Sequence, residues 1–255
     1  MKRITNTLIS LVVLTILTAG FATAATITIR TDMWAPYTDE PGEKPGYMVE
    51  VAEAIFTANG DKIDYQLMPW TRCLEDVKKG TYDAVLGTDP DESPTFVYPV
   101  EALGVNQNAF YVKKGSSWKY TNTESFKQIR LGLIDGYGYY PELDSYIETY
   151  KGNKLFKATG DDALPKLLKM LKAGRLDAVI DNVNVMSSII QNEKLENTIV
   201  SAGVVDHKSD LFMAFTPAKD SSKDYAKIFD AGLVELRNSG KLQEILAKYG
   251  LKDWK

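Results

Sequence analysis

Apolar positions along the chain alternate between two spacings from Thr26 onward. Short β-branched or alternating runs, at residues 26–31 and 63–67, predict strands. Apolar residues at i, i+3, i+4 and i+7, as in residues 48–55, predict helices, and a glycine closes several of them. This alternation of strand and helix patterns predicts an α/β protein with largely parallel sheets.

One unit of this pattern occurs twice. "GTYDAVLGT" (residues 80–88) and "GRLDAVIDN" (residues 174–182) each place a glycine at a helix end and an Asp-Ala-Val strand after it. The loop that leaves such a strand lies at the carboxyl edge of the sheet, where α/β proteins bind ligands. The repeat favours two similar α/β lobes, although a helix-to-strand joint of this kind is also generic. After a polar break at residues 206–210, a strand at 211–216 and two helices complete the chain.

The N-terminus has the pattern of a secretory signal. Lys2 and Arg3 precede an apolar run at residues 8–17, and small residues at 22–24 predict cleavage after Ala24. A retained membrane anchor is the alternative, but the apolar run is short for a membrane span. No cysteine lies near the cleavage site, so we expect a periplasmic protein without a lipid anchor.

Composition excludes several classes of protein. A net charge of −4 and a pI near 5.2 argue against nucleic-acid binding. The single cysteine, Cys73, falls at an apolar helix position and is expected to be a buried, inert thiol. The single histidine, His207, has no Ser/His/Asp or Cys/His set around it, and we expect a solvated hinge residue. Metal-ligand clusters and phosphate-binding glycine loops are not found in the sequence, so neither a metal nor a cofactor is expected.

Several segments in order along the chain carry a resemblance to a known family. They are "WAPY" (34–37), "GYMVEVAEAI" (46–55), "PWTR" (69–72), "KKGTYDAVLGT" (78–88), "LGLIDGYGYY" (131–140), "KAGRLDAVIDN" (172–182) and "GLVELRNSGKLQEILAKYG" (232–250). This ordered set resembles bacterial extracellular solute-binding protein family 3, the type II periplasmic binding proteins of ABC importers.

The resemblance implies a fold and a partner. The fold is two-lobed, with a mixed sheet flanked by helices in each lobe and two crossing strands as a hinge. Lobe 1 comprises residues 25–105 and 210–255, and lobe 2 comprises residues 106–209, with hinges near 105–107 and 207–210. The implied protein is a monomer that captures a small-molecule solute between its lobes and delivers it to the membrane permease of an ABC importer.

The resemblance also implies which residues meet the solute. Two aromatics would stack on it, the two strand exits would offer polar groups, and the loop at 137–139 would meet its other end. Trp and Tyr suit this role because they combine rigid stacking area with a polar tip. The expected site residues are Trp34, Tyr37, Trp70, Arg72, Gly87, Thr88, Tyr137, Tyr139, Asp181 and Asn182. For each aromatic residue, packing in the core is the alternative.

Two positions depart from the pattern of the family's amino-acid binders. Thr95 stands about where an arginine usually pairs with the ligand carboxylate, and Asn182 stands where an acid usually takes the amino group. Arg72 is either a replacement for that arginine or a surface residue on a helix turn. Acidic residues at 89, 91 and 92 suggest instead a cationic solute held by cation–π contacts, or simply a polar turn. We therefore expect neutral amino acids to bind poorly.

Two other functions remain open at this point. The same fold also hosts exported dehydratases that act on cyclohexadienyl amino-acid precursors, and it serves as the ligand-sensing domain of receptors. Catalysis needs a placed acid or base, and the sequence arranges none around His207. We expect a binding protein and no enzymatic activity.

Overall fold

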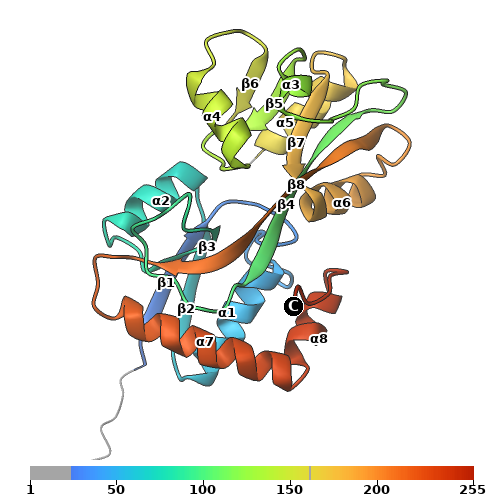
Figure 1. Ribbon diagram of the computed structural model, residues 1–255. Helices are drawn as coiled ribbons and strands as arrows, with labels where there is room; N and C mark the ends of the chain where they lie inside the picture. The colour runs from blue at the N-terminus through green and yellow to red at the C-terminus, as the bar shows by residue number, and fades with distance from the viewer. Residues whose placement is uncertain (1–23, 161) are drawn as a thin grey trace, which may run out of the picture.

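The computed structural model describes residues 24–160 and 162–255 (Figure 1). The predicted signal peptide of residues 1–24 lies outside the described residues, except for Ala24. Within the described ranges, no helix is both long enough and apolar enough to cross a membrane.

Strands and helices follow one another as the periodicity predicts, with several additions. The strands are β1 (Thr26–Thr31), β2 (Lys62–Leu67), β3 (Ala84–Thr88), β4 (Gly104–Lys113), β5 (Leu131–Ile134), β6 (Leu155–Ala158), β7 (Ala178–Asn182) and β8 (Ile199–Phe215). The helices are α1 (Tyr47–Ala58), α2 (Trp70–Lys78), α3 (Thr123–Phe126), α4 (Pro141–Thr149), α5 (Ala163–Lys172), α6 (Val183–Asn192), α7 (Ser222–Asn238) and α8 (Lys241–Ala247). The short elements β6 and α3 were not expected from the sequence.

The strands form one sheet of order β2-β1-β3-β8-β4-β7-β5-β6, which divides into two halves. Strands β1, β2 and β3 are parallel on one side, and β5, β6 and β7 are parallel on the other. In Figure 1 the first group lies below with α1, α2, α7 and α8, and the second lies above with α3 to α6. We call these parts lobe 1 and lobe 2. The predicted two-lobed periplasmic-binding-protein-like fold is confirmed.

Two long antiparallel strands, β4 and β8, join the lobes (Figure 1). The segments predicted as hinges pair with each other, since Val105 lies opposite Asp210 and Gln107 lies opposite Lys208. The polar run at 206–210, expected as a break before a strand, is instead part of the 17-residue strand β8. Pairing with β4 satisfies the backbone there, so the polar side chains can stay at the surface. Because both strands run through both lobes, boundaries at residues 105 and 210 remain a prediction.

The aspartate of the repeated unit has the same structural role in each lobe. Asp83 Oδ2 accepts hydrogen bonds from the backbone N–H of Thr28 at 2.8 Å and from its hydroxyl at 2.6 Å. Asp177 Oδ2 accepts from the backbone N–H of Arg130 at 2.7 Å, and Oδ1 pairs with the guanidinium of Arg130 at 2.6 Å. Asp83 therefore anchors the beginning of β3 to the parallel strand β1. Asp177 likewise anchors the beginning of β7 to the start of the parallel strand β5.

Cys73 is fully buried, as predicted, in a cluster with Val77 and Val85. Its thiol donates to the carbonyl of Met68 at 3.3 Å, and burial raises the pKa of the thiol far above its usual range. A thiol held in its neutral form is a poor nucleophile.

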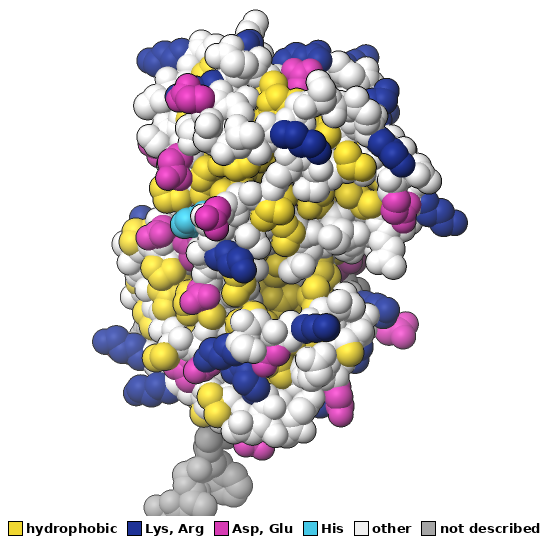
Figure 2. Space-filling view, turned by 45° about the vertical axis from the view of Figure 1, so that its right-hand side comes forward, with side chains coloured by type: hydrophobic (Ala, Val, Ile, Leu, Met, Phe, Trp, Pro, Cys, Tyr) yellow, Lys and Arg dark blue, Asp and Glu magenta, His cyan; other side chains and the backbone are white. Residues whose placement is uncertain are grey.

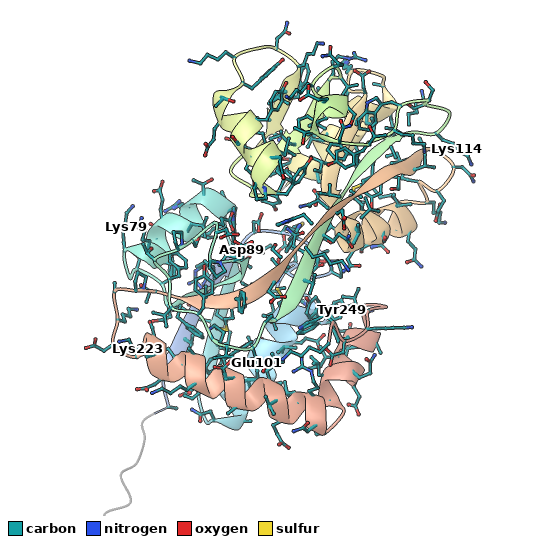
Figure 3. The ribbon with its side chains drawn as sticks, viewed as in Figure 1. Lys79, Asp89, Glu101, Lys114, Lys223 and Tyr249 are labelled. Atoms are coloured by element: carbon teal, nitrogen blue, oxygen red, sulfur yellow. The ribbon has the colours of Figure 1, made fainter. Side chains whose placement is uncertain are left out.

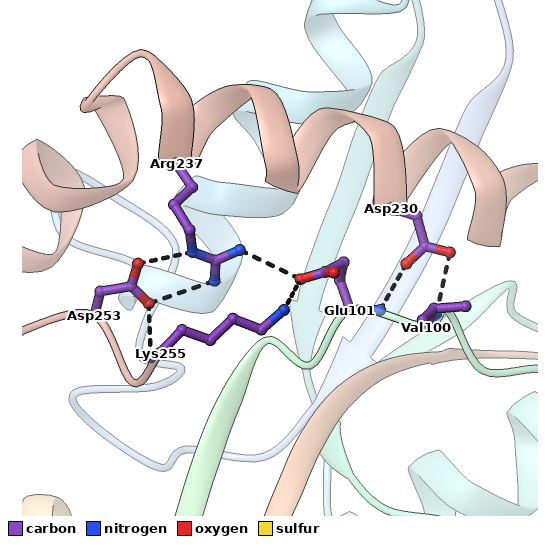
Figure 4. A network of polar contacts seen from close by, with 6 residues as sticks. All are labelled: Val100, Glu101, Asp230, Arg237, Asp253 and Lys255. Atoms are coloured by element: carbon purple, nitrogen blue, oxygen red, sulfur yellow. Dashed lines mark hydrogen bonds and ion pairs between the residues drawn. The ribbon is translucent and has the colours of Figure 1, made fainter.

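The C-terminal tail fastens the segment that leads into β4 (Figure 4). Arg237 on α7 donates to Asp253 at 2.7 Å and to Glu101 at 3.3 Å. Asp230, about two turns earlier on the same face of α7, accepts the backbone N–H groups of Val100 and Glu101 at 3.1 and 2.7 Å. These contacts hold the start of the crossing strand to lobe 1.

Candidate functional site

A cavity of about 370 Å³ lies where the two lobes meet. Lobe 1 supplies the loop after β1 and the start of α2, and lobe 2 supplies the loops after β5 and β6, the end of β7, and helices α5 and α6. Apolar side chains gather in the hollow between the lobes on the face shown in Figure 2. The volume falls in the range of small-ligand pockets.

Aromatic rings from both lobes form one wall of this cavity. Trp34 stacks on Tyr37 with ring centroids 4.3 Å apart, and it meets Tyr137 of lobe 2 edge-on at 6.4 Å. The Tyr137 hydroxyl donates to Asp32 in the loop after β1. Trp34 and Tyr137 line the cavity, while Tyr37 is buried behind Trp34 and is not among the residues that line this cavity.

Trp70 also lines the cavity, and an acid holds its indole in place. Trp70 Nε1 donates to Glu92 Oε1 at 2.8 Å, and the hydroxyl of Thr88 donates to Glu92 Oε2 at 2.8 Å. Burial raises the pKa of Glu92 to about 7, against the opposing effect of these two donors. The sequence suggested only negative charge or a polar turn at residue 92. Its role in fixing Trp70 depends on a contact across 22 residues, which local pattern does not reveal.

Asp181 is the buried acid of lobe 2 and lines the same cavity. Its side chain is 1% exposed, and Oδ1 accepts the backbone N–H of Asn182 at 2.7 Å. Among the described residues, Oδ2 has no hydrogen-bond partner. The Trp34 indole faces this carboxyl and partly lowers its pKa, but the two groups do not reach hydrogen-bond geometry. Burial dominates, and it raises the pKa of Asp181 to about 7.

Asn182, predicted to meet the solute, makes hydrogen bonds to other parts of the protein through both atoms of its side-chain amide. Its Oδ1 accepts the backbone N–H of Asn184 at 2.8 Å, which caps α6, and the hydroxyl of Tyr37 at 3.2 Å. Its Nδ2 donates to Asn106 on β4 at 2.8 Å. The asparagine therefore joins α6, the crossing strand and lobe 1, and it is not among the residues that line the cavity.

Three further candidates lie away from this cavity. Arg72 is 69% exposed on α2, where it pairs with Asp76 at 3.4 Å. Tyr139 is a core residue, since its hydroxyl accepts the backbone N–H of Ile134 at 2.7 Å. Gly87, with a φ of +91°, lines a neighbouring space of about 50 Å³ that shares Trp34, Trp70 and Tyr137 with the larger cavity.

The cavity lining carries only negative formal charge among its described residues. The acids are Asp32, Asp135, Asp181 and Glu193, and neither lysine nor arginine is present in the described lining. Asp135 has a cation already, because Lys157 lies 3.3 Å from it. The sequence analysis missed Asp32, Asp135 and Glu193, although Asp32 lies only two residues before Trp34, the first residue of "WAPY". In the described part of the chain, no group of three or more His, Cys, Asp or Glu could hold a metal ion.

His207 lies in β8 and lines a different hollow together with Asp89, which is labelled in Figure 3. It is partly exposed, and its imidazole does not line the 370 Å³ cavity. The expected position in a crossing segment agrees with the structure.

A family profile and a curated relative both match most of this chain. A sequence profile of "Bacterial extracellular solute-binding proteins, family 3" matches residues 27–252. A Neisseria gonorrhoeae protein named "Probable histidine-binding protein" is 22% identical over 221 residues, which are 84% of this chain and 78% of that protein.

Two solved structures have the same fold. A histidine kinase sensor domain with similarity to periplasmic binding proteins superposes with a TM-score of 0.73 at 21% identity, covering 88% of this chain and 95% of that one. The arginine-, lysine-, histidine-binding protein ArtJ of Geobacillus stearothermophilus has a TM-score of 0.72 at 18% identity, covering 90% of this chain and 97% of that one. With a family profile that matches nearly all of the described residues, the chain belongs to the bacterial extracellular solute-binding proteins of family 3.

Proposed function

We propose that the protein binds a small organic cation in the cavity between its lobes. The observation that carries this proposal is Asp181, a buried carboxyl that lines the cavity and whose Oδ2 has no partner among the described residues. Burying a carboxylate is costly unless a cation or several donors compensate it. An ammonium or guanidinium group that reaches Oδ2 would supply that compensation.

The walls of the cavity favour the same chemistry. Trp34 and Tyr137 present aromatic rings, whose faces attract cations. In the described lining, no lysine or arginine competes for Asp181. The negative net charge of the lining would also attract positively charged solutes and raise their concentration at the cleft.

Neutral amino acids suit the cavity less well. Thr95 is exposed, and Arg72 is largely exposed on α2, pairs with Asp76 and is not part of the cavity lining. The described lining therefore offers no guanidinium to an α-carboxylate. We expect glutamine and similar neutral amino acids to bind poorly, and cations that do not need a carboxylate partner to bind best.

In the cell, we propose that the protein is exported, works as a monomer in the periplasm and delivers its solute to the permease of an ABC importer. The family description and the N-terminal pattern of residues 2–24 support this role. The sensor-domain neighbour supports the alternative of a ligand-sensing domain. A mature N-terminus at Ala25, measured by mass spectrometry of the exported protein, supports the importer role; an intact N-terminus in the membrane fraction contradicts it.

We propose binding without catalysis. The family description and the position of His207 outside the cavity support this proposal. Asp181 and Glu92, with pKa values raised by burial to about 7, are the groups that a dehydratase would need as acid or base. Incubation with a cyclohexadienyl amino-acid precursor, followed by mass spectrometry, should recover the compound unchanged.

Native mass spectrometry of the protein as isolated tests the proposed function directly. We expect a bound molecule that carries a positive charge. Calorimetry with simple alkylamines should show stoichiometric binding, tighter than that of arginine or histidine, whose α-carboxylate has no cationic partner in the described lining. Asp181→Asn is the matched control, because it keeps the shape of the side chain and removes its charge. Tight binding of glutamine, with no binding of any cation, would contradict the proposal.

A further inference from the structure

The cavity does not end at the interlobe cleft. The same space is lined, deeper in lobe 2, by Leu164 at the start of α5 and by Val185 and Ile189 on α6. It reaches the surface at Asn192 and Glu193, both exposed, where α6 ends. We call the part of the cavity between α5 and α6 the side groove.

Strand geometry places Asp181 on the same side of the sheet as this groove. Val179, two residues earlier on β7, packs in one hydrophobic cluster with Leu164 and Val185. Ile180 packs in the other cluster of lobe 2, on the opposite face of the sheet. Since successive side chains of a strand alternate between faces, Asp181 shares the face of Val179, and Asn182 shares the face of Ile180.

The groove therefore has a charged end, an apolar middle and a second charged end. Asp181, buried and with Oδ2 unpartnered within the described residues, lies at the inner end. Leu164, Val185 and Ile189 supply the apolar walls, and Glu193 lies at the outer mouth. Glu193 is also the C-cap residue of α6, directly after the helix, where the negative end of the helix dipole adds to the attraction for a cation.

We propose that the side groove binds the chain of an elongated dication, of the α,ω-diamine class. One ammonium pairs with Asp181 beside Trp34, the methylene chain lies along α5 and α6, and the second ammonium reaches Glu193. This inference rests on the proposed function, because it assigns the same cavity a solute length and a second charge.

A length series of solutes tests the groove. Calorimetry with diamines from 1,3-diaminopropane to 1,6-diaminohexane should show affinity that rises with chain length, by roughly fourfold for each methylene taken from water. The diamines should also bind more tightly than monoamines of equal length. Short cations that bind with no dependence on length would overturn the side groove alone. If no cation of any length binds, the proposed function fails as well.

Two variants separate the groove from the cleft. Ile189→Trp fills the apolar middle, so it should abolish the length dependence and leave the binding of methylamine within about threefold. Glu193→Gln removes the outer charge at an exposed position and should weaken diamines by up to about fivefold, the range of an exposed ion pair. Glu196→Gln, at an exposed residue outside the cavity lining, is the matched control and should change nothing.

If one of these two variants folds poorly, the other still tests the side groove. Circular dichroism checks the fold of Ile189→Trp, and Glu193→Gln changes only an exposed side chain. Loss of diamine affinity in Glu193→Gln, with monoamine affinity unchanged, supports the groove. Equal effects on monoamines and diamines in both variants would overturn it.

Discussion

Lobe 1 and lobe 2 present the same helix–glycine–strand unit to the cleft, and each keeps one acid with a pKa near 7 beside it. In lobe 1, Glu92 follows β3 and receives one donor at each oxygen, from Trp70 and Thr88. In lobe 2, Asp181 is the penultimate residue of β7 and receives only the backbone N–H of Asn182 among the described groups. Burial raises the pKa of both acids to about 7.

The difference shows that a raised pKa does not by itself identify a binding group. Burial sets the pKa of both carboxyls, but the number of protein donors decides which carboxyl remains available to a solute. Glu92 positions an aromatic wall, and its oxygens are engaged in doing so. Asp181 has an oxygen to offer, so the two acids should respond differently to the same experiments.

The largest expected effect separates the two acids directly. Asp181→Asn should weaken the binding of an organic cation by about 100-fold or more, because breaking a buried charge pair costs several kcal/mol. Glu92→Gln should weaken it by less than about tenfold, since Glu92 acts on the solute only through Trp70. Isothermal titration calorimetry on the two variants measures both values. Equal losses in the two variants would mean that the acids have equivalent roles.

The aromatic wall is expected to contribute the next largest effect. Trp34→Ala should weaken binding by about 1–4 kcal/mol, the range of buried aromatic anchors. Trp34→Phe keeps a ring and should recover part of the loss. Thermal unfolding checks that both variants remain folded. Unchanged affinity in Trp34→Ala would place this residue in the packing of Tyr37 rather than in the site.

The pH dependence of binding should follow Asp181. Its pKa is raised to about 7 by burial, with Asp32 raising it further and the indole of Trp34 lowering it. A cation pairs with the deprotonated carboxylate, so affinity should level off above pH 7 and fall by up to about tenfold per unit below it. Titrations between pH 5.5 and 8 should show this in the wild type and in Glu92→Gln. If the affinity of Asp181→Asn falls by the same amount at low pH, a group other than Asp181 controls the pH dependence of binding.

The raised pKa of Asp181 also affects the stability of the ligand-free protein. Here a rise in pH acts in the opposite direction from its effect on cation binding. A carboxyl whose folded pKa is raised binds more protons in the folded state, so the ligand-free protein should lose stability as the pH rises from about 4 to 7. Asp181→Asn should reduce this slope, which denaturant unfolding at pH 4.5 and 7.5 would measure. An identical slope in wild type and variant would contradict the raised pKa.

The smallest effect is expected at Arg72. Its guanidinium is largely exposed and pairs only with Asp76 in the described structure, a surface pair of the kind worth about 0–1 kcal/mol. Arg72→Ala should leave the affinity for cations unchanged, and it should leave any weak binding of acids unchanged too. A large loss of binding for an acidic solute would show that α2 turns this side chain into the cleft.

Particular residues show how far the sequence could be interpreted. The spacing of apolar residues predicted the α/β lobes. The resemblance to the family implied that Trp34 and Trp70 face the solute, and both residues line the cavity. Both properties depend on residues close together in the chain. The partner of Trp70 is Glu92, and the donor to Asp32 is Tyr137 of the other lobe, so neither contact could be read from a local pattern.

The sequence by itself determined the repeated strand unit, the two lobes and the pair Asp181–Asn182 at the exit of β7. Only the tertiary structure decided which of the two meets the cavity. Neighbouring residues of a strand face opposite sides of the sheet, and the side that becomes the cavity wall depends on where α5 and α6 pack. Helix α6 takes Asn182 as its cap, and the packing of Val179 against α5 and α6 leaves Asp181 facing the cavity. That choice comes from contacts between distant segments, which periodicity along the chain does not encode.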